Sequence, residues 1–567
     1  RIYLGGQEHF YLEGQIALVT PGEDGDVLVQ CSSQHPSEIQ HTVAKVLGQA
    51  NNAVAVEVRR MGGAFGGKES QGNLPAAVAA LAAVRSGRAV KVRYDRDQDM
   101  TITGKRHDFR IDYRVGFDDM GRIEGIAFDQ AARCGMSYDL SDPICDRAMF
   151  HADNAYYLPN ARITSYRCKT HTVSNTAFRG FGGPQGMVGM ERVIDEIAHA
   201  VGRDPADVRV ENFYDPAPEA GGAPRPRTVT TYHMTVEDNV IHEIVADLRR
   251  SSDYDRRRAE ISAWNAASPI LKRGIALTPV KFGISFTLTF LNQAGALVHV
   301  YNDGSVHLNH GGTEMGQGLF TKVAQVAAEE LQVPIDRIKI TPTHTGKVPN
   351  TSATAASSGS DINGMAVVDA CRQIKTRLQA FAAERWQAPP ETIVFAKGRV
   401  HVGEEVVTFD ELAREAYQAR VSLSAAGFYA TPKIHWDRAA ARGRPFYYFA
   451  YGAAVTEAAV DTLTGENRLL RVDILHDVGR SLNPALDLGQ IEGGFVQGAG
   501  WLTTEELWWD EEGRLRTHAP STYKIPTAGD RPPDMRIALW EKGVNREETV
   551  YRSKAVGEPP LMLGISA

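Results

Sequence analysis

Alternating apolar and polar residues predict strands in several parts of the chain. Single strands are expected over 26–33, 53–61 and 89–96, where side chains alternate with the period of a β-strand. Two hairpins are expected over 107–132 and 296–308, each around a turn that ends in glycine. The chain is therefore expected to contain sheets.

Apolar residues at helical spacing predict helices between these strands. One helix should end at Gly202, and Asp204 with the following proline should start the next. Thr235, with an acidic residue three positions later, is expected to start another helix, and the longest helix is predicted over 361–386. Strands mixed with helices, without tandem repeats, indicate α+β lobes packed together.

The length of 567 residues is several times that of an average domain, so two or more lobes are expected. We predict the α+β class with two large elongated mixed α/β lobes, over 1–245 and 246–567, and a cofactor between them. The segment 215–227, rich in Pro, Gly and Ala, is predicted to be a connection. Because Arg1 opens the chain without an initiator Met, we expect a piece of a longer protein.

Composition favours a small-molecule substrate. The 62 Lys and Arg against 69 Asp and Glu give a formal charge of -7, which predicts no nucleic-acid partner and no membrane partner. No apolar run approaches the roughly 18 residues of a membrane helix, and a cytoplasmic protein is expected. The five cysteines are an odd number without C-x-x-C spacing, so they predict neither zinc nor an iron-sulfur cluster on this chain.

The most informative pattern is a predicted glycine-rich loop, usually after a strand and before a helix, that recurs at 62–69, 178–186, 311–318, 354–361 and 489–498. Glycine allows the backbone to approach a ligand closely, and unpaired N–H groups at a helix start favour anions. The segments also carry side chains that can hold a ligand, namely Arg179, Gln317, Ser357, Ser358 and Gln490. Together they predict a large, flat cofactor with a phosphate, although any one segment could merely turn the chain.

The first of these segments allows a second interpretation. Residues 62–68 satisfy G-x-x-x-x-G-K between a strand and a helix, which is the context of a phosphate-binding P-loop. Glu69 stands where that motif needs a Ser or Thr hydroxyl for magnesium, and its charge would repel nucleotide phosphates. A nucleotide hydrolase is therefore disfavoured.

Long motifs at 5–13, 60–69, 175–186, 311–318 and 554–560 resemble the molybdenum domain of the xanthine oxidase family, in the same order and over essentially the whole chain. The resemblance implies molybdenum held by the dithiolene of a molybdopterin, with oxo and sulfido groups and no direct protein ligand. Gln34 and Phe65 are implied to lie by the apical oxo group. The residues implied to contact the pterin and its phosphate are Arg179, Met315, Gln317, Ala356, Ser357, Ser358, Gly359 and Gln490.

The resemblance also implies the substrate site. Phe181 and Phe286 would sandwich a purine ring, with Thr287 beside it and with Leu140 and Leu291 as further contacts. Without the resemblance, Phe181 and Phe286 would each be interpreted as ordinary core residues.

Three charged residues carry the implied chemistry. Glu558 would be the general base in the insertion of a water-derived oxygen, while hydride passes to the molybdenum centre. Glu69 and Arg147 would stabilise charge on the purine, which favours oxidation of hypoxanthine to xanthine and urate over aldehyde oxidation. Two alternatives stay open: an aldehyde oxidase of the same family, and a non-catalytic pterin-binding protein.

The resemblance implies partners as well. The family's iron-sulfur and flavin regions and a few final segments are absent from this sequence, so FAD and 2Fe-2S clusters are expected on another subunit or on missing segments. Electrons would leave by that route, with NAD as the expected acceptor, and a dimer of such units is expected.

Overall fold

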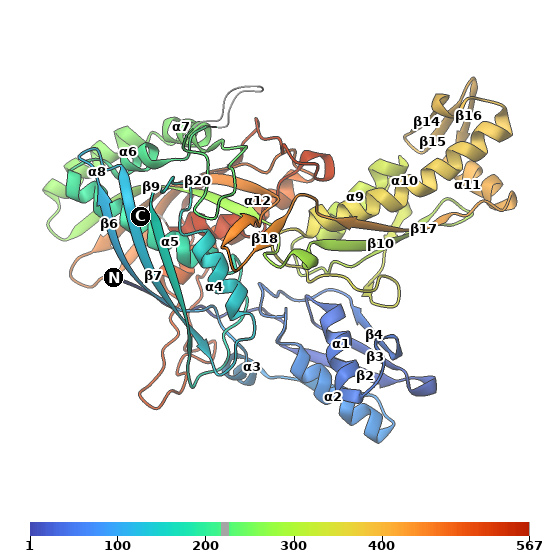
Figure 1. Ribbon diagram of the computed structural model, residues 1–567, viewed down its shortest axis with the longest axis horizontal. Helices are drawn as coiled ribbons and strands as arrows, with labels where there is room; N and C mark the ends of the chain where they lie inside the picture. The colour runs from blue at the N-terminus through green and yellow to red at the C-terminus, as the bar shows by residue number, and fades with distance from the viewer. Residues whose placement is uncertain (217–225, 566–567) are drawn as a thin grey trace.

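The computed structural model describes residues 1–216 and 226–565, which form a mixed α/β fold. The molecule is elongated, with a broad part that holds both termini and a narrower arm at the other end (Figure 1). The predicted connection at 215–227 falls mostly on residues 217–225, outside the described part. The α+β class is confirmed, whereas the boundary at residue 245 stays a prediction.

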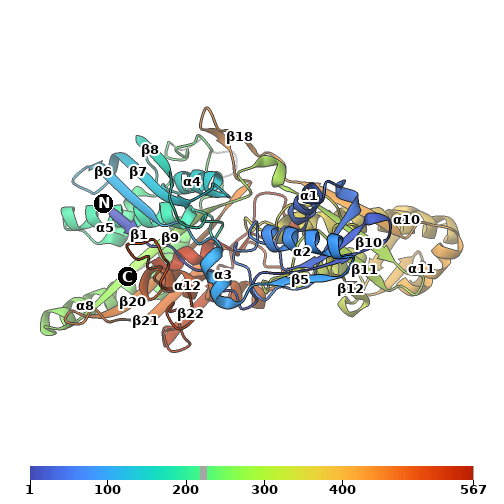
Figure 2. The same cartoon turned by 90° about the horizontal axis from the view of Figure 1, so that it is seen from below.

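The first sheet has five strands in the order β13-β4-β3-β2-β5. Its buried side chains alternate along the strands, as the sequence predicts for 26–33 and 53–61. Two helices cover it, and they lie together on the side seen from below (Figure 2). The elements are β2 (Ile16–Pro21), β3 (Val27–Cys31), β4 (Val54–Val58), β5 (Val90–Arg93), β13 (Thr343–His344), α1 (Pro36–Leu47) and α2 (Asn73–Ser86).

Two four-stranded sheets, β1-β6-β7-β8 and β22-β21-β20-β9, build the broad part around one shared core. This core includes Ile111 and Met187 from before residue 245, and Val455 and Phe495 from after it. The strands are β1 (Ile2–Leu4), β6 (Phe109–Phe117), β7 (Ile123–Gly135), β8 (Ala161–Lys169), β9 (Leu271–Ile284), β20 (Tyr448–Asp461), β21 (Asn467–His476) and β22 (Asp534–Leu539). The helices are α3 (Arg96–Ile102), α4 (Ser141–Phe150), α5 (Gly183–Val201), α6 (Pro205–Asn212), α7 (Ile241–Ser251), α8 (Tyr254–Ala267) and α12 (Pro484–Thr503).

The arm is built on a sheet of order β12-β11-β10-β17, with a small sheet β14-β15-β16 at its tip (Figure 1). A separate core fills it, in which one face of α10 packs on the sheet. The helices are α9 (Leu319–Leu331), α10 (Gly359–Trp386) and α11 (Phe409–Gln418). The strands are β10 (Gln293–Val300), β11 (Val306–His310), β12 (Ile338–Ile340), β14 (Ile393–Ala396), β15 (Arg399–Val402), β16 (Glu405–Thr408) and β17 (Ser424–Ala430), and a ribbon of β18 (His435–Asp437) and β19 (Arg442–Arg444) lies apart from them.

Both predicted hairpins are confirmed, as β6 with β7 and β10 with β11. The helix α5 ends at Gly202, and the side chain of Asp204 caps α6 by accepting from the backbone N–H of Ala206. The helix expected from Thr235 instead begins at Ile241. Asp238, the expected acidic partner of Thr235 at the helix start, forms an ion pair with Lys554 at 2.9 Å, so the predicted helix start was wrong.

The segment 489–498 was also predicted wrongly as a loop, because it lies inside α12. Its glycines serve packing: a Cβ atom on Gly498 would lie 2.0 Å from the carbonyl oxygen of Leu561. The short helix η7 (Pro559–Ile565) can therefore lie directly against α12. This contact brings the C-terminal segment, and the motif that precedes it, next to the other glycine-rich segments.

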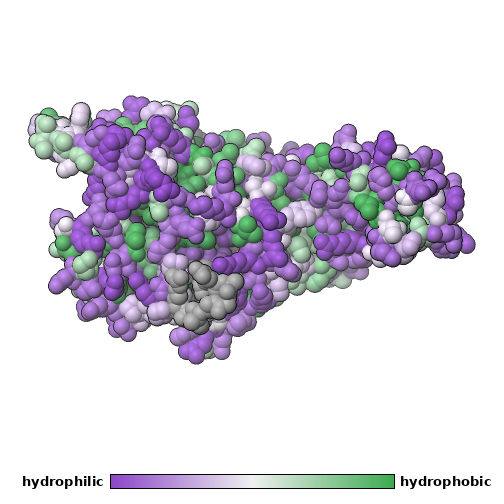
Figure 3. Space-filling model, turned by 90° about the horizontal axis from the view of Figure 1, so that it is seen from above, coloured by the Kyte–Doolittle hydropathy of each residue, from purple (hydrophilic) through white to green (hydrophobic). Residues whose placement is uncertain are grey.

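The upper face of the molecule is mostly polar, with apolar side chains in small scattered groups (Figure 3). Within residues 1–216 and 226–565, no helix is long and apolar enough to cross a membrane.

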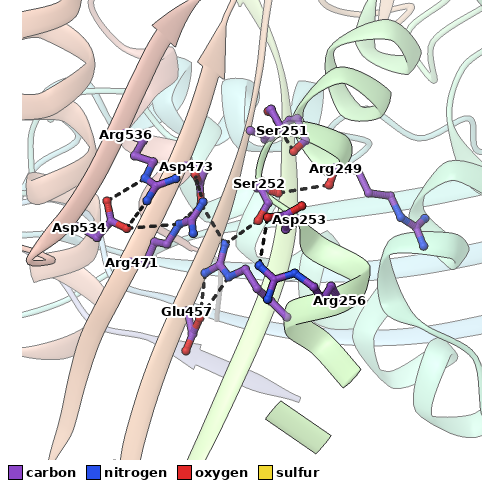
Figure 4. A network of polar contacts seen from close by, with 12 residues as sticks. Arg249, Ser251, Ser252, Asp253, Arg256, Glu457, Arg471, Asp473, Asp534 and Arg536 are labelled. Atoms are coloured by element: carbon purple, nitrogen blue, oxygen red, sulfur yellow. Dashed lines mark hydrogen bonds and ion pairs between the residues drawn. The ribbon is translucent and has the colours of Figure 1, made fainter. Parts of the chain in front are cut away.

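A buried charge network joins α8 to the second broad sheet. The guanidinium of Arg257 donates to Glu457 on β20 at 2.8 Å and to Asp473 on β21 at 2.9 Å. Arg273 also pairs with Glu457, and Arg471 holds the other side of Asp473, as Figure 4 shows for Asp473 and its neighbours. Because Arg257, Glu457 and Asp473 are all about 5% exposed or less, each of these charges depends on its partners.

Replacing Arg257 by alanine is expected to lower the free energy of unfolding by about 3 kcal/mol. The loss arises because two buried carboxylates lose a shared cation. It stays near the lower end of what a broken buried pair costs, since Arg273 and Arg471 remain in place. Urea unfolding of the variant and the parent protein gives the difference.

The neighbouring Arg256 offers a matched control. Its side chain is 59% exposed and pairs with Asp253 and Glu260 at the surface. Arg256→Ala should therefore cost less than about 1 kcal/mol. Equal losses for the two variants would contradict a stabilising role for the buried network.

Candidate active site

A cavity of about 560 Å³ collects most of the residues that the sequence analysis singled out. It is lined by loops that follow β3, β4, β8 and β11, by the start of α10, by α12 and by the C-terminal segment. The predicted residues that line it are Gln34, Phe65, Glu69, Arg179, Phe181, Met315, Gln317, Ala356, Ser357, Gly359, Gln490 and Glu558. Six others are not among its lining residues, namely Leu140, Arg147, Phe286, Thr287, Leu291 and Ser358.

Gln34 links two sides of the cavity through its carboxamide. Its Oε1 accepts from the backbone N–H groups of Gly66 at 3.0 Å and Lys68 at 3.3 Å. Its Nε2 donates to the carbonyl oxygen of Thr354 at 3.0 Å. The side chain is 3% exposed, so the carboxamide fixes the loop after β4 against the segment that leads into α10.

Arg179 makes the corresponding link on the opposite side. Its guanidinium donates to the carbonyl oxygens of Gly557 at 2.5 Å and Gln490 at 3.0 Å. Its backbone N–H donates to the carbonyl oxygen of Phe65 at 2.9 Å. Burial lowers the pKa of Arg179 to about 10, while the charge of Glu558 opposes this shift. The residue therefore stays cationic at neutral pH and ties α12 to the C-terminal segment.

Five lining residues other than glycine adopt a left-handed backbone conformation, one of them Phe10 with a φ angle of 50°. The φ angles of the other four are 56° at Phe65, 51° at Phe181, 53° at Ala356 and 57° at Ser357. Such a conformation costs on the order of 1–3 kcal/mol for each residue, and surrounding contacts must hold it. Backbone strain of this kind gathers at functional sites, and here it gathers around one cavity.

The loop before α9 does not leave its helix start free for an anion. The carboxylate of Glu314 accepts from the backbone N–H groups of Gly316, Gly318 and Phe320 at 2.9–3.0 Å. The Glu314 carboxylate therefore occupies backbone N–H groups that could otherwise bind a phosphate of the ligand. What the loop presents to the cavity is Gln317, whose Oε1 accepts from the backbone N–H of Met315 at 2.7 Å.

The carboxyl group of Glu558 lies at the meeting point of three segments. Its Oε1 accepts from the backbone N–H of Gly180 at 3.1 Å, and its Oε2 accepts from the hydroxyl of Ser357 at 2.9 Å. The residue is 9% exposed and lines the cavity. A carboxyl group held by two donors at the edge of a cavity can accept a proton from a bound molecule.

Glu69 is the opposite case, a carboxyl group without partners. It is 7% exposed and lines the cavity, and its side chain makes no hydrogen bond or ion pair to any described residue. Burial, together with the charges of Glu38, Asp139 and Glu558, raises the pKa of Glu69 to about 8. Glu69 is therefore protonated at neutral pH and can donate a hydrogen bond to a ligand.

Arg147 turns its guanidinium toward the end of β9. It donates to the carbonyl oxygens of Ser285 at 3.0 Å and Gly283 at 2.5 Å, and it lies over the rings of Phe282 and Phe446. The side chain is 1% exposed, and its Nε has no partner among the described residues. Burial lowers its pKa, and the charge of Glu558 opposes the shift.

The other residues implied to contact substrate or the pterin are not among the residues that line the cavity. Phe286 packs in a small cluster with Ala353 and Ala356, with Leu291 against it. This cluster joins the loop after β9 to a residue that does line the cavity. Leu140 precedes α4, the helix that carries Arg147. Thr287 is half-buried next to Phe286, and Ser358 is 4% exposed with its hydroxyl on the carbonyl oxygen of Ala355.

Several charged residues that line the cavity were not among the predicted site residues. Lys322 on α9 pairs with Asp487 on α12 at 2.5 Å, and burial raises the pKa of Asp361 to about 7 and that of Glu505 to about 7. Lys554 is held between Asp238 and Asp477. For Lys322 and Asp487 the signal is a charged residue within an otherwise apolar or glycine-rich segment, where burial is costly unless the charge is paired.

Two family models described as a molybdopterin cofactor-binding domain match residues 1–213 and 247–532. The second match alone covers half of the chain. The chain belongs to the molybdopterin cofactor-binding family. The predicted resemblance to the molybdopterin-binding region of the xanthine oxidase family is therefore confirmed.

Curated relatives agree with this assignment. The chain is 46% identical over 566 residues to the xanthine dehydrogenase/oxidase of Mus musculus, and 44% identical to the xanthine dehydrogenases of Dictyostelium discoideum and Oryza sativa subsp. japonica. The alignments cover 99–100% of this chain but 40% of each relative. The chain thus spans two fifths of the length of these relatives.

Solved structures show the same fold at low sequence identity. Quinoline 2-oxidoreductase from Pseudomonas putida 86 has a TM-score of 0.86 at 22% identity, with 99% of this chain and 71% of that chain covered. The aldehyde oxidoreductase from Desulfovibrio gigas gives 0.85 at 23% identity, with coverage of 99% and 57%. The Cu,Mo-CO dehydrogenase gives 0.87 at 22% identity, with coverage of 100% and 71%.

The donors around the cavity fit a molybdopterin. Carboxamides of Gln34, Gln317 and Gln490 and backbone groups of strained loops suit a flat polar ring system, and Cβ atoms on Gly316 and Gly489 would meet no atom within 4 Å. Residues 1–216 and 226–565 contain no group of three or more His, Cys, Asp or Glu side chains placed to hold a metal ion.

Glu69→Gln is expected to make the protein more stable than the parent at pH 8.5 but not at pH 4. A pKa raised from its ordinary value to about 8 means that the folded state binds this proton more tightly than the unfolded state. The parent therefore loses stability as pH rises from about 4.5 to 8, by up to about 5 kcal/mol, and the amide does not. Urea unfolding midpoints at both pH values provide the measurement.

The control is Glu404→Gln in the exposed turn between β15 and β16. It should give the same difference from the parent at both pH values. If Glu69→Gln also gave a constant difference, Glu69 would not be buried in its protonated form.

Proposed function

We propose that this chain is the molybdopterin-binding part of a xanthine dehydrogenase that hydroxylates hypoxanthine to xanthine and xanthine to urate. The proposal rests on one observation: Glu558, Glu69 and Arg179 line the same cavity. The carboxyl group of Glu558 accepts two hydrogen bonds, whereas that of Glu69 has no partner and a raised pKa. The 44–46% identity to xanthine dehydrogenases over the whole chain supports it.

The cofactor would be held by backbone and carboxamide groups. Gln34, Gln317, Gln490 and the strained Ala356 and Ser357 line the cavity from both sides. When bound, the molybdenum pterin supplies a centre that accepts two electrons from the substrate. The role of this chain is to hold that centre, to orient the purine and to move protons.

Glu558 would act as the general base. Its carboxyl group, held by Gly180 and Ser357, would take the proton from the water-derived nucleophile at Oε1 or Oε2 as oxygen attacks the ring. Glu69, which is neutral, would donate a hydrogen bond to a ring nitrogen or oxygen that gains negative charge. Phe181 would pack on the face of the ring.

Arg147 would stabilise the same charge from farther away. Its unpartnered Nε and the influence of the Glu558 charge on its pKa support this role. Its two hydrogen bonds to the end of β9 would equally suit a structural role. The second reading would favour an aldehyde oxidase of the same family. Substrate preference therefore depends on what Arg147 does.

The two electrons would leave through iron-sulfur clusters and FAD on parts of the complete protein outside this chain, with NAD as acceptor. The relatives are more than twice as long as this chain, which supports such parts. We propose that the complete protein is a dimer in the cytoplasm.

Glu558→Ala is expected to lower kcat by about 10²–10⁴-fold, because a positioned base contributes an effect of that size. The fold and the cofactor content should be unchanged, since Arg179 and α12 hold the surrounding segments. Turnover of xanthine per bound molybdenum is the measurement.

Glu548→Ala is the matched control, because Glu548 lies in the same C-terminal segment with 85% of its side chain exposed. It should retain the turnover of the parent. If the turnover of Glu558→Ala stayed within a few-fold of the parent's, another residue would have to be the base.

Glu69→Ala and Arg147→Met are expected to lower kcat/KM for xanthine about 100-fold more than for a small aromatic aldehyde, which lacks the purine's polar edges. The reason is that both groups would stabilise negative charge on purine atoms in the transition state. The ratio of kcat/KM for the two substrates, corrected for molybdenum content, is the measurement.

Arg438→Met is the control for Arg147→Met. Arg438 is 59% exposed and pairs with Asp146 on the same helix α4, so its loss disturbs the helix without reaching the cavity. Its substrate ratio should match the parent's. An unchanged ratio in both Glu69→Ala and Arg147→Met would reduce the assignment to a molybdenum hydroxylase of unspecified substrate.

A further inference from the structure

The hydroxyl of Ser357 is directed at Glu558. Its Oγ donates to Oε2 of the carboxyl group at 2.9 Å, and it has no second hydrogen-bond partner in the described part of the chain. The neighbouring Ser358 differs, because its hydroxyl returns to the carbonyl oxygen of Ala355 within the same turn. Two adjacent serines in one segment therefore have separate structural roles.

The backbone is strained to place this hydroxyl. Ala356 and Ser357 are consecutive residues with φ angles of 53° and 57°, a conformation that side chains other than glycine rarely adopt. The turn they make directs Ser357 across the cavity, while Thr354 is held by Gln34 and the residues from Gly359 begin α10. Strain that persists in a fixed surrounding points to a function for the group that it positions.

The partner side is shaped to receive Ser357. A Cβ atom on Gly557 would lie 3.1 Å from the Oγ of Ser357, closer than side chains normally approach. The residue before Glu558 is therefore small where Ser357 packs against it. Arg179 fixes the same peptide by donating to the carbonyl oxygen of Gly557.

We propose that Ser357 is a positioning residue for the carboxyl group of Glu558, a role beyond the cofactor contact that the family resemblance implies. The backbone N–H of Gly180 holds Oε1 and the hydroxyl of Ser357 holds Oε2, so the two donors together fix the plane of the carboxyl group. With one donor the group can rotate, and a base must be aligned with the proton that it takes. The inference rests on the proposed function, in which Glu558 is the base.

Ser357→Gly tests the proposal, because glycine adopts the left-handed conformation without strain and removes only the hydroxymethyl group. We expect kcat for xanthine to fall about tenfold or more with KM and cofactor content unchanged, since a hydrogen bond to a charged group is lost. Ser357→Asn, which tolerates this conformation and offers an N–H donor, should recover part of the loss.

A second readout does not depend on turnover. The infrared carboxylate band that disappears in Glu558→Gln belongs to Glu558, and its frequency should shift in Ser357→Gly as the hydrogen bond is lost. Ser352→Ala removes a buried hydroxyl from the same segment without a bond to Glu558, and it should leave the band and kcat as in the parent.

An unshifted band in Ser357→Gly would overturn the proposal. So would a loss of cofactor content with kcat per cofactor unchanged, because Ser357 would then serve the cofactor alone. Parental turnover in Glu558→Ala combined with a shifted band would overturn the assignment of the base, and the positioning role with it, while the contact itself would stand. The two failures are therefore distinguishable.

Discussion

The site depends on hydrogen bonds that join loops distant in sequence, and the carboxamide of Gln34 makes the central one. It accepts from Gly66 and Lys68 and donates to Thr354, which lie more than 280 residues apart along the chain. A carboxamide can do this because it offers an acceptor and a donor on one rigid plane. Replacing this group would free both the loop that carries Glu69 and the segment that carries Ser357.

Arg179 extends the same principle to α12 and the C-terminal segment. Its guanidinium reaches two carbonyl oxygens at once, and its backbone donates to a third. Burial of such a group is favourable only when its donors are satisfied, so the loops and the arginine stabilise one another. The left-handed residues Phe65, Phe181, Ala356 and Ser357 persist inside this set of contacts, because no single loop could maintain them alone.

Much of the fold could be predicted from local pattern, since hairpins and helix ends are encoded by nearby residues. Gly202 and Asp204 end and begin helices by their own backbone and side-chain chemistry, and the structure has both. The helix start predicted from Thr235 and Asp238 was wrong, because the carboxylate of Asp238 pairs with Lys554, which is distant along the chain. The helix α12 was missed because its glycines allow η7 to pack closely against it, and a local sequence pattern does not reveal such a distant contact.

The sequence could predict which residues form the site better than it could predict how their side chains are arranged. Twelve of the predicted residues line one cavity, because long motifs mark the loops that meet there. The sequence could not show that Glu314 fills a helix start intended for a phosphate, nor that Arg147 faces the end of β9. Both features depend on the direction of a side chain, which the sequence does not encode locally.

The clearest result of side-chain direction is the contrast between two carboxyl groups of one cavity. Glu69 has no partner and burial keeps it protonated, whereas Glu558 accepts from two donors. One group can then donate a hydrogen bond to the substrate while the other accepts a proton, so their surroundings alone can separate the two roles.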